Sequence, residues 1–161
     1  MNKALAKYLN DHLAGSVAAI ELLDHLIDRN DGTDKERGFT QLRSEVEEDQ
    51  KVLKQILESV GGKESSMRKA TAWLTEKLGQ AKFHLDDPGE GELAELEALE
   101  TLGLGIQGKL ALWRALPGVA NRIPRLPKLD FERLQHRATE QFNRVEAQRL
   151  QAAQAALAES Q

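Results

Sequence analysis

The chain has 161 residues, a formal net charge of −4 at pH 7 and 40% hydrophobic residues, few of them aromatic. This length and composition fit a single domain covering residues 1–161. The absence of cysteine excludes disulfides, thiol catalysis and cysteine-bound zinc or iron–sulfur clusters. Because no segment has a signal-peptide core or an apolar run long enough to cross a bilayer, we expect no membrane association and a cytoplasmic protein.

The first two predicted elements are long amphipathic helices. Residues 3–28 carry leucine and isoleucine at helical spacing, and the turn that contains Gly32 ends this first helix. Residues 34–60 repeat the pattern, and Gly61-Gly62 ends the second helix because glycine readily adopts the left-handed backbone found after helix C-termini.

Three more helices are predicted in the rest of the chain. The third begins after Ser65 or Ser66 and runs to about residue 85, and the fourth covers residues 93–116. Residues 117–128 contain three prolines and predict an irregular segment. The fifth helix begins after Asp130, its expected N-cap, and continues to about residue 157. No convincing strand pattern interrupts the series, so the predicted fold class is all-α.

The fourth predicted helix contains three glycines, Gly103, Gly105 and Gly108. Each costs about 1 kcal/mol of helix propensity relative to alanine. We expect close approach of a neighbouring helix to compensate for this cost, with a local kink as the alternative. The spacing also matches Gly-x-Gly-x-x-Gly, but no strand precedes it, so it fails as a nucleotide-binding loop.

Several polar side chains fall on or beside the apolar faces of their helices. They are His12, Asp49, Lys77, Gln141 and Arg149. Because an unpaired buried charge costs several kcal/mol, we predict an internal network in which Asp49 accepts from Arg149, Lys77 or both, with His12 and Gln141 nearby. In the alternative, Lys77 and Arg149 extend to the surface and His12 is half-exposed.

The charges are unevenly distributed along the chain. Residues 1–108 carry a net charge of −8, whereas residues 109–137 carry +5. Leu104 and Leu112 are expected on the outer face of the fourth helix. Together these features predict a homo-oligomer, most simply a dimer. The basic segment lacks interleaved aromatics and a helix-turn-helix pattern, so nucleic-acid binding is not favoured.

Residues 8–16 (YLNDHLAGS) and 104–109 (LGIQGK) resemble the corresponding segments of a divergent bacterial group of uncertain function within the ferritin-like superfamily. The resemblance covers nearly the whole chain and rests on helix lengths and on these segments. It implies a four-helix bundle made of the first, second, fourth and fifth predicted helices, with the third as an additional crossover helix. The Glu-x-x-His ligand pairs of the di-iron members of this superfamily are absent here.

Two functions remain open from the sequence. In the first, the chain is a non-enzymatic binding or structural module with the buried polar network, no di-metal centre and no cofactor. Its small-molecule ligand is unknown. In the alternative, it is a di-metal carboxylate oxidase or storage protein whose ligands are Glu45, Asp49, Glu100 and His12.

Overall fold

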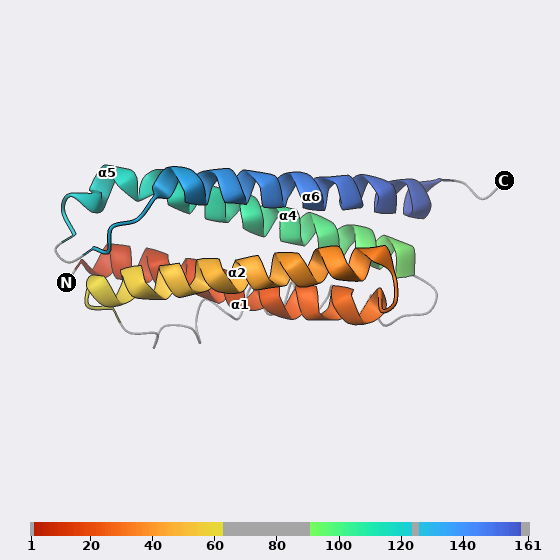
Figure 1. The fold of residues 1–161 in the computed structure, drawn as a ribbon, viewed down its shortest axis with the longest axis horizontal. Coiled ribbons are helices and arrows are strands. Elements are labelled where there is room, and N and C mark those ends of the chain that lie inside the picture. Colours follow the sequence, from red (N-terminus) through yellow and green to blue (C-terminus); the bar gives the residue numbers. More distant parts are fainter. Residues whose placement is uncertain (1, 63–90, 124–125, 159–161) are drawn as a thin grey trace.

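The computed structural model describes residues 2–62, 91–123 and 126–158, and within them the chain is all-α. It contains four long helices and one short one in these ranges, with no strand (Figure 1). Their bounds are α1 Lys3–Arg29, α2 Asp34–Ser59, α4 Gly91–Ala115, α5 Pro117–Ala120 and α6 Phe131–Leu157. The predicted fold class is confirmed, whereas the predicted third helix with Lys77 lies outside the described residues.

Capping interactions define the helix ends. The Asn2 side chain accepts a hydrogen bond from the Leu5 amide (3.1 Å) at the start of α1, and Asp130 accepts from the Arg133 amide (3.0 Å) at the start of α6. After α2, Gly61 has φ +73° and its amide donates to the Glu58 carbonyl at 2.9 Å. The predicted helix-terminating role of Gly61 is thereby confirmed.

The four long helices lie side by side along the long axis of the molecule (Figure 1). α1 packs antiparallel against α2, and α4 packs antiparallel against α6. Contacts between α1 and α4 join these two hairpins. α2 and α4 run in the same direction, because α2 ends at one end of the molecule and α4 begins at the other.

The hydrophobic core consists of two clusters at different levels along the helices. One includes Leu26, Phe39 and Leu99, and the other includes Leu9 and Trp113. Each cluster receives side chains from all four long helices. Between the two levels lie Asp49 of α2, Lys109 of α4 and Gln141 of α6, which are hydrogen-bonded to one another. They form a polar layer near the middle of the molecule.

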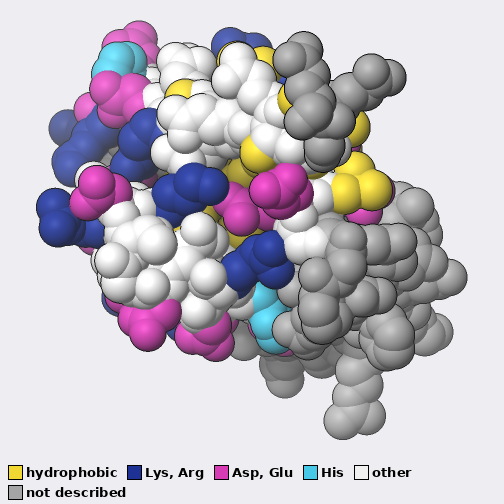
Figure 2. Space-filling view, turned by 90° about the vertical axis from the view of Figure 1, so that its right-hand side faces the viewer, with side chains coloured by type: hydrophobic (Ala, Val, Ile, Leu, Met, Phe, Trp, Pro, Cys, Tyr) yellow, Lys and Arg dark blue, Asp and Glu magenta, His cyan; other side chains and the backbone are white. Residues whose placement is uncertain are grey.

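At the end of the molecule that holds the turn between α1 and α2, acidic and basic side chains lie next to one another, with hydrophobic side chains visible in small patches between them (Figure 2). Glu95, near the start of α4, is largely buried at this end and pairs with Lys35 (2.8 Å) and Arg29 (3.6 Å). These ion pairs tie α4 to α1 and α2.

Several expectations about the fourth helix need correction. Leu104 is 75% exposed, as expected, but Leu112 is buried and packs beside Trp113 in the core. A Cβ on Gly103 would lie 3.6 Å from Phe142, whereas a Cβ on Gly105 or Gly108 would meet no described atom within 4 Å. Close helix packing therefore does not account for these two glycines within the described residues.

The segment after the fourth helix is less irregular than predicted, since Pro117 begins the short helix α5. Proline suits this position because its fixed φ matches the helix and its missing N–H is not needed there. No helix in the described ranges is long and apolar enough to cross a membrane.

Candidate functional site

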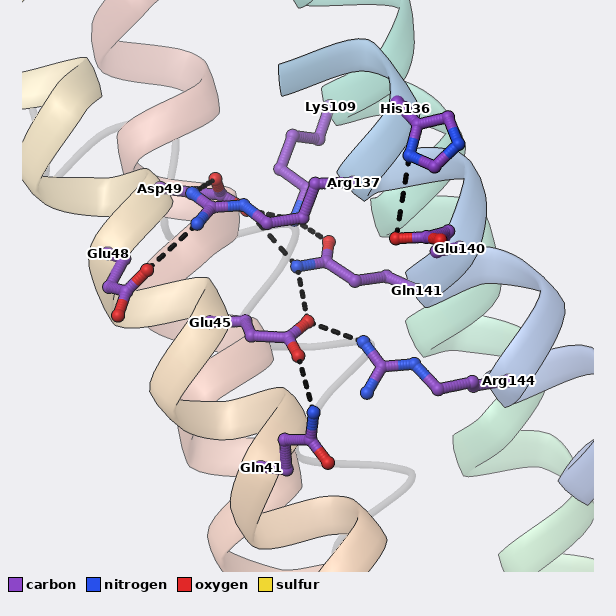
Figure 3. A network of polar contacts seen from close by, with 10 residues as sticks. All are labelled: Gln41, Glu45, Glu48, Asp49, Lys109, His136, Arg137, Glu140, Gln141 and Arg144. Carbon is purple, nitrogen blue, oxygen red and sulfur yellow. Dashed lines mark hydrogen bonds and ion pairs between the residues drawn. The ribbon is translucent and has the colours of Figure 1, made fainter. Parts of the chain in front are cut away.

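The centre of the polar layer is Asp49, which is 3% exposed. Its Oδ2 accepts a hydrogen bond from the Lys109 ammonium of α4 at 2.6 Å, and its Oδ1 accepts one from the Arg137 guanidinium of α6 (Figure 3). One buried carboxylate on α2 thus joins both helices of the second hairpin. Two cations with direct bonds supply the compensation that a buried carboxylate requires.

Gln141 completes the inner part of the layer and is fully buried. Its carbonyl oxygen accepts from the Lys109 ammonium, and its amide nitrogen donates to Glu45 (3.0 Å) and Asp49 (3.4 Å). Both ends of the amide therefore face groups of the right polarity. Its position on α6 makes it the link between the Asp49 cluster and the next carboxylate along α2.

The outer part of the network lies between α2 and α6. Arg137 also donates to Glu48 at 2.8 Å, and Arg144 donates to Glu45 (Figure 3). The three carboxylates and three cations of this network balance in charge. Long polar side chains therefore bridge α2 and α6, whose backbones lie farther apart than those within each hairpin.

Burial and pairing shift the pKa values in opposite directions. Burial lowers the pKa of the Lys109 ammonium, and the Asp49 carboxylate opposes that shift. Burial alone would raise the pKa of Glu45, but hydrogen bonds from Arg144 and Gln141 produce a net lowering. Burial also opposes ionisation of Arg137, yet its bonds to Asp49 and Glu48 raise its pKa overall.

A cavity of about 180 Å³ lies beside this network and is lined by α1, α2 and α4. Asp49 lines it from α2, Lys109 and Trp113 line it from α4, and His12 and Gly15 line it from α1. The surface of its wall is mostly apolar. The cavity therefore lies between the network and α1, and no described ion of α1 bonds to the network.

His12 is half-buried on the α1 side of the cavity. Its ring packs edge-to-face against Tyr8, with centroids 4.7 Å apart. Burial lowers the pKa of the imidazole, opposed by the nearby Asp11 carboxylate, and this favours the neutral form of His12. It makes no hydrogen bond with any described residue, which leaves both ring nitrogens available to a ligand.

Comparison with protein-family models, with curated proteins and with solved structures gives no match for this chain. The geometry of the site is therefore the basis for assigning its role.

Of the five residues predicted for the network, Asp49 and Gln141 are in direct contact, and His12 lines the same cavity as Asp49. Lys77 lies outside the described residues. The predicted pair between Asp49 and Arg149 is wrong, because Arg149 bonds to Glu146 at 2.7 Å. Its other partner is Glu100, at 3.5 Å.

The error concerns position along the helix axis. Helical phase places Arg149 close to the apolar face of α6, but it does not fix the level at which α6 meets α2. Asp49 faces Arg137 and Gln141, and at 1.5 Å per residue Arg149 lies about 12 Å beyond Gln141 along α6. Long side chains cannot span that distance, and Arg149 pairs locally instead.

Lys109 and Arg137 were missed as network members. Both belong to the basic segment of residues 109–137, whose charges we expected at the surface. A signal for Lys109 was present, since it ends the segment 104–109 that carries the ferritin-like resemblance. The signal for Arg137 is its position one helical turn before Gln141, on the same face of α6.

The alternative metal ligands Glu45, Asp49, Glu100 and His12 are not gathered into one site. Glu45 and Asp49 share the Gln141 amide, but each is also bonded to an arginine. Glu100 has a half-exposed side chain and pairs with Arg149. Within residues 2–62, 91–123 and 126–158, no three His, Asp or Glu side chains form a group that could hold a metal ion.

Proposed function

We propose that this chain is a ferritin-like helical bundle without a di-metal centre, acting as a non-enzymatic binding module in the cytoplasm. The ion network occupies its middle layer, and the adjoining cavity receives the ligand. The observation that carries this proposal is the bonding of Asp49 to both Lys109 and Arg137 at the centre of the molecule.

The direction of the helices supports the ferritin-like part of the proposal. α2 ends at one end of the molecule and α4 begins at the other, so these two helices run the same way (Figure 1). In ferritin-like bundles the second and third helices also run the same way, because one long crossover joins them. The other neighbouring pairs, α1 with α2 and α4 with α6, are antiparallel, as that topology requires.

The chemistry of the middle layer supports the absence of a metal. In di-iron carboxylate proteins, inward-facing Glu and Glu-x-x-His residues supply the ligands. Here Lys109 and Arg137 donate to Asp49, so the acceptor atoms that a cation would need are already engaged. A divalent ion placed there would also be repelled by two neighbouring positive charges.

The experiment that tests this proposal is elemental analysis of protein purified without oxygen. We expect iron, manganese and zinc well below one atom per chain. Iron or manganese at one or two atoms per chain would favour the di-metal alternative. The variant Lys109→Met removes a cation that bonds to Asp49. If a metal ion binds at this site, its affinity for the variant should be higher than for the parent protein.

The proposal includes self-association, most simply as a dimer. Leu104 is 75% exposed on α4, and basic residues concentrate in residues 109–137 of an otherwise acidic chain. Sedimentation should show a species larger than one chain, and Leu104→Lys should weaken it. A monomer at high protein concentration would remove this part of the proposal and leave the rest intact.

A further inference from the structure

The cavity beside Asp49 contains glycines where helices ordinarily carry larger residues. Gly15 on α1 and Gly105 and Gly108 on α4 all line it. A Cβ on any of them would meet no described atom within 4 Å. No described residue would therefore obstruct alanine at these positions, and alanine would favour the helix by about 0.5–1 kcal/mol at each. The sequence thus forgoes helix stability at three positions that border one open space.

The size of the cavity limits what it can hold. A cavity of about 150 Å³ in a helical protein accommodates benzene. The space here measures about 180 Å³ and is mostly apolar. A single six-membered ring with one small substituent therefore matches this volume.

The charged groups on the described cavity wall are already paired. Asp49 and Lys109 bond to each other at 2.6 Å, and Asp11 bonds to Lys7 at 2.6 Å. A charged ligand would therefore compete with these pairs for a partner. A charged group entering the space would also lose its hydration.

The His12 imidazole on the cavity wall makes no hydrogen bond with a described residue. Burial lowers its pKa and so favours the neutral form, which offers one donor and one acceptor. A ligand in the cavity can therefore bond to either ring nitrogen.

We propose that this cavity binds a small neutral ring compound bearing one hydroxyl group, with the ring over Gly108 and the hydroxyl bonded to His12. This inference rests on the proposed function and names the class of ligand for it. A hydroxyl group suits the site because it can both donate to and accept from a neutral imidazole.

The test is a ¹⁹F NMR titration of the protein with 4-fluorophenol. We expect saturable binding with a dissociation constant below about 1 mM. Gly108→Leu, which fills the space, should weaken binding at least about tenfold while the helical signal in circular dichroism is retained. Gly38→Leu is the matched control on the exposed face of α2, and it should leave binding unchanged.

Two further arms test the polar contact and the charge. His12→Phe should weaken 4-fluorophenol about three- to tenfold, as expected for one hydrogen bond, and leave fluorobenzene binding unchanged. The anion 4-fluorobenzoate should bind the parent protein at least about tenfold more weakly than 4-fluorophenol.

Three results would overturn the inference: no saturable binding up to about 5 mM probe, equal binding by Gly108→Leu and the parent, or equal binding of 4-fluorobenzoate. The metal analysis tests the proposed function separately. Metal-free protein that fails to bind 4-fluorophenol would reject the ligand class alone, whereas stoichiometric iron would reject the module itself.

Discussion

The ammonium group of Lys109 and the carboxylate of Asp49 lie 2.6 Å apart, in the layer that separates the two apolar clusters of the core. Asp49 belongs to the first hairpin of helices and Lys109 to the second. The apolar contacts above and below this layer would tolerate small shifts of one hairpin along the other. A buried ion pair with defined partners does not, so we infer that it sets the register between the hairpins.

Replacing Asp49 with alanine should lower the free energy of unfolding by about 3–5 kcal/mol. The reason is that Lys109 and Arg137 would lose the buried anion between them. Asp49→Asn should cost less, because the amide keeps a hydrogen-bond acceptor in place. Urea unfolding followed by circular dichroism measures both effects.

The matched control is Glu48→Ala on the adjacent residue. Glu48 also bonds to Arg137, but 58% of its side chain is exposed, so its removal should cost less than about 1 kcal/mol. Equal unfolding midpoints for Asp49→Ala and Glu48→Ala would show that the buried network adds nothing to stability.

A second prediction compares two arginines of α6. Arg137→Met should destabilise the protein by about 2 kcal/mol, because it leaves Asp49 with a single cationic partner. Arg149→Met should cost no more than about 1 kcal/mol, because its pairs with Glu146 and Glu100 lie at the surface. If Arg149→Met proved the more damaging change, the assignment of Arg137 to the network would be wrong.

These two arginines also show what the sequence could and could not predict. Helix positions follow from local rules, so the bounds of four long helices were predicted within a few residues, as were the cap at Asp130 and the stop at Gly61. The same periodicity placed Asp49 and Gln141 on inward faces. Periodicity, however, shows only which face of a helix a residue occupies. It contains no information on how far a second helix is shifted along the axis of the first.

Lys109 was missed for a different reason. A lysine near the end of a helix is usually solvated, and only the position of Asp49 on another helix makes its burial favourable. The glycines at residues 105 and 108 were misread in a related way. Both close packing and an open cavity place glycine in a helix, and only the positions of the neighbouring helices distinguish them.

The third prediction concerns the pH dependence of stability. The pKa of Glu45 is lowered in the folded protein from its ordinary value of 4.5. As the pH falls through 4.5, the unfolded chain therefore binds more protons than the folded protein. The stabilisation from Glu45 is therefore complete above that pH and is lost as the pH approaches the folded-state pKa. Glu45→Gln should reduce the loss of stability in this window, as measured by urea unfolding between pH 3 and 6. The same slope in parent and variant would contradict the assignment.

The last prediction compares a glycine after the end of α2 with a glycine inside that helix. Gly61 has φ +73°, a backbone conformation that is unfavourable for residues with a Cβ, so Gly61→Ala should lower the free energy of unfolding by about 1 kcal/mol. Gly38 lies within α2, and a Cβ there would meet no described atom within 4 Å. Gly38→Ala should therefore raise the free energy of unfolding by about 0.5–1 kcal/mol. Urea unfolding measures both effects. An unchanged slope of the unfolding free energy against urea concentration (the m-value) would show that both changes act on stability alone. A stabilised Gly61→Ala protein would mean that α2 continues beyond Ser59, and that the turn which ends it is not fixed by glycine.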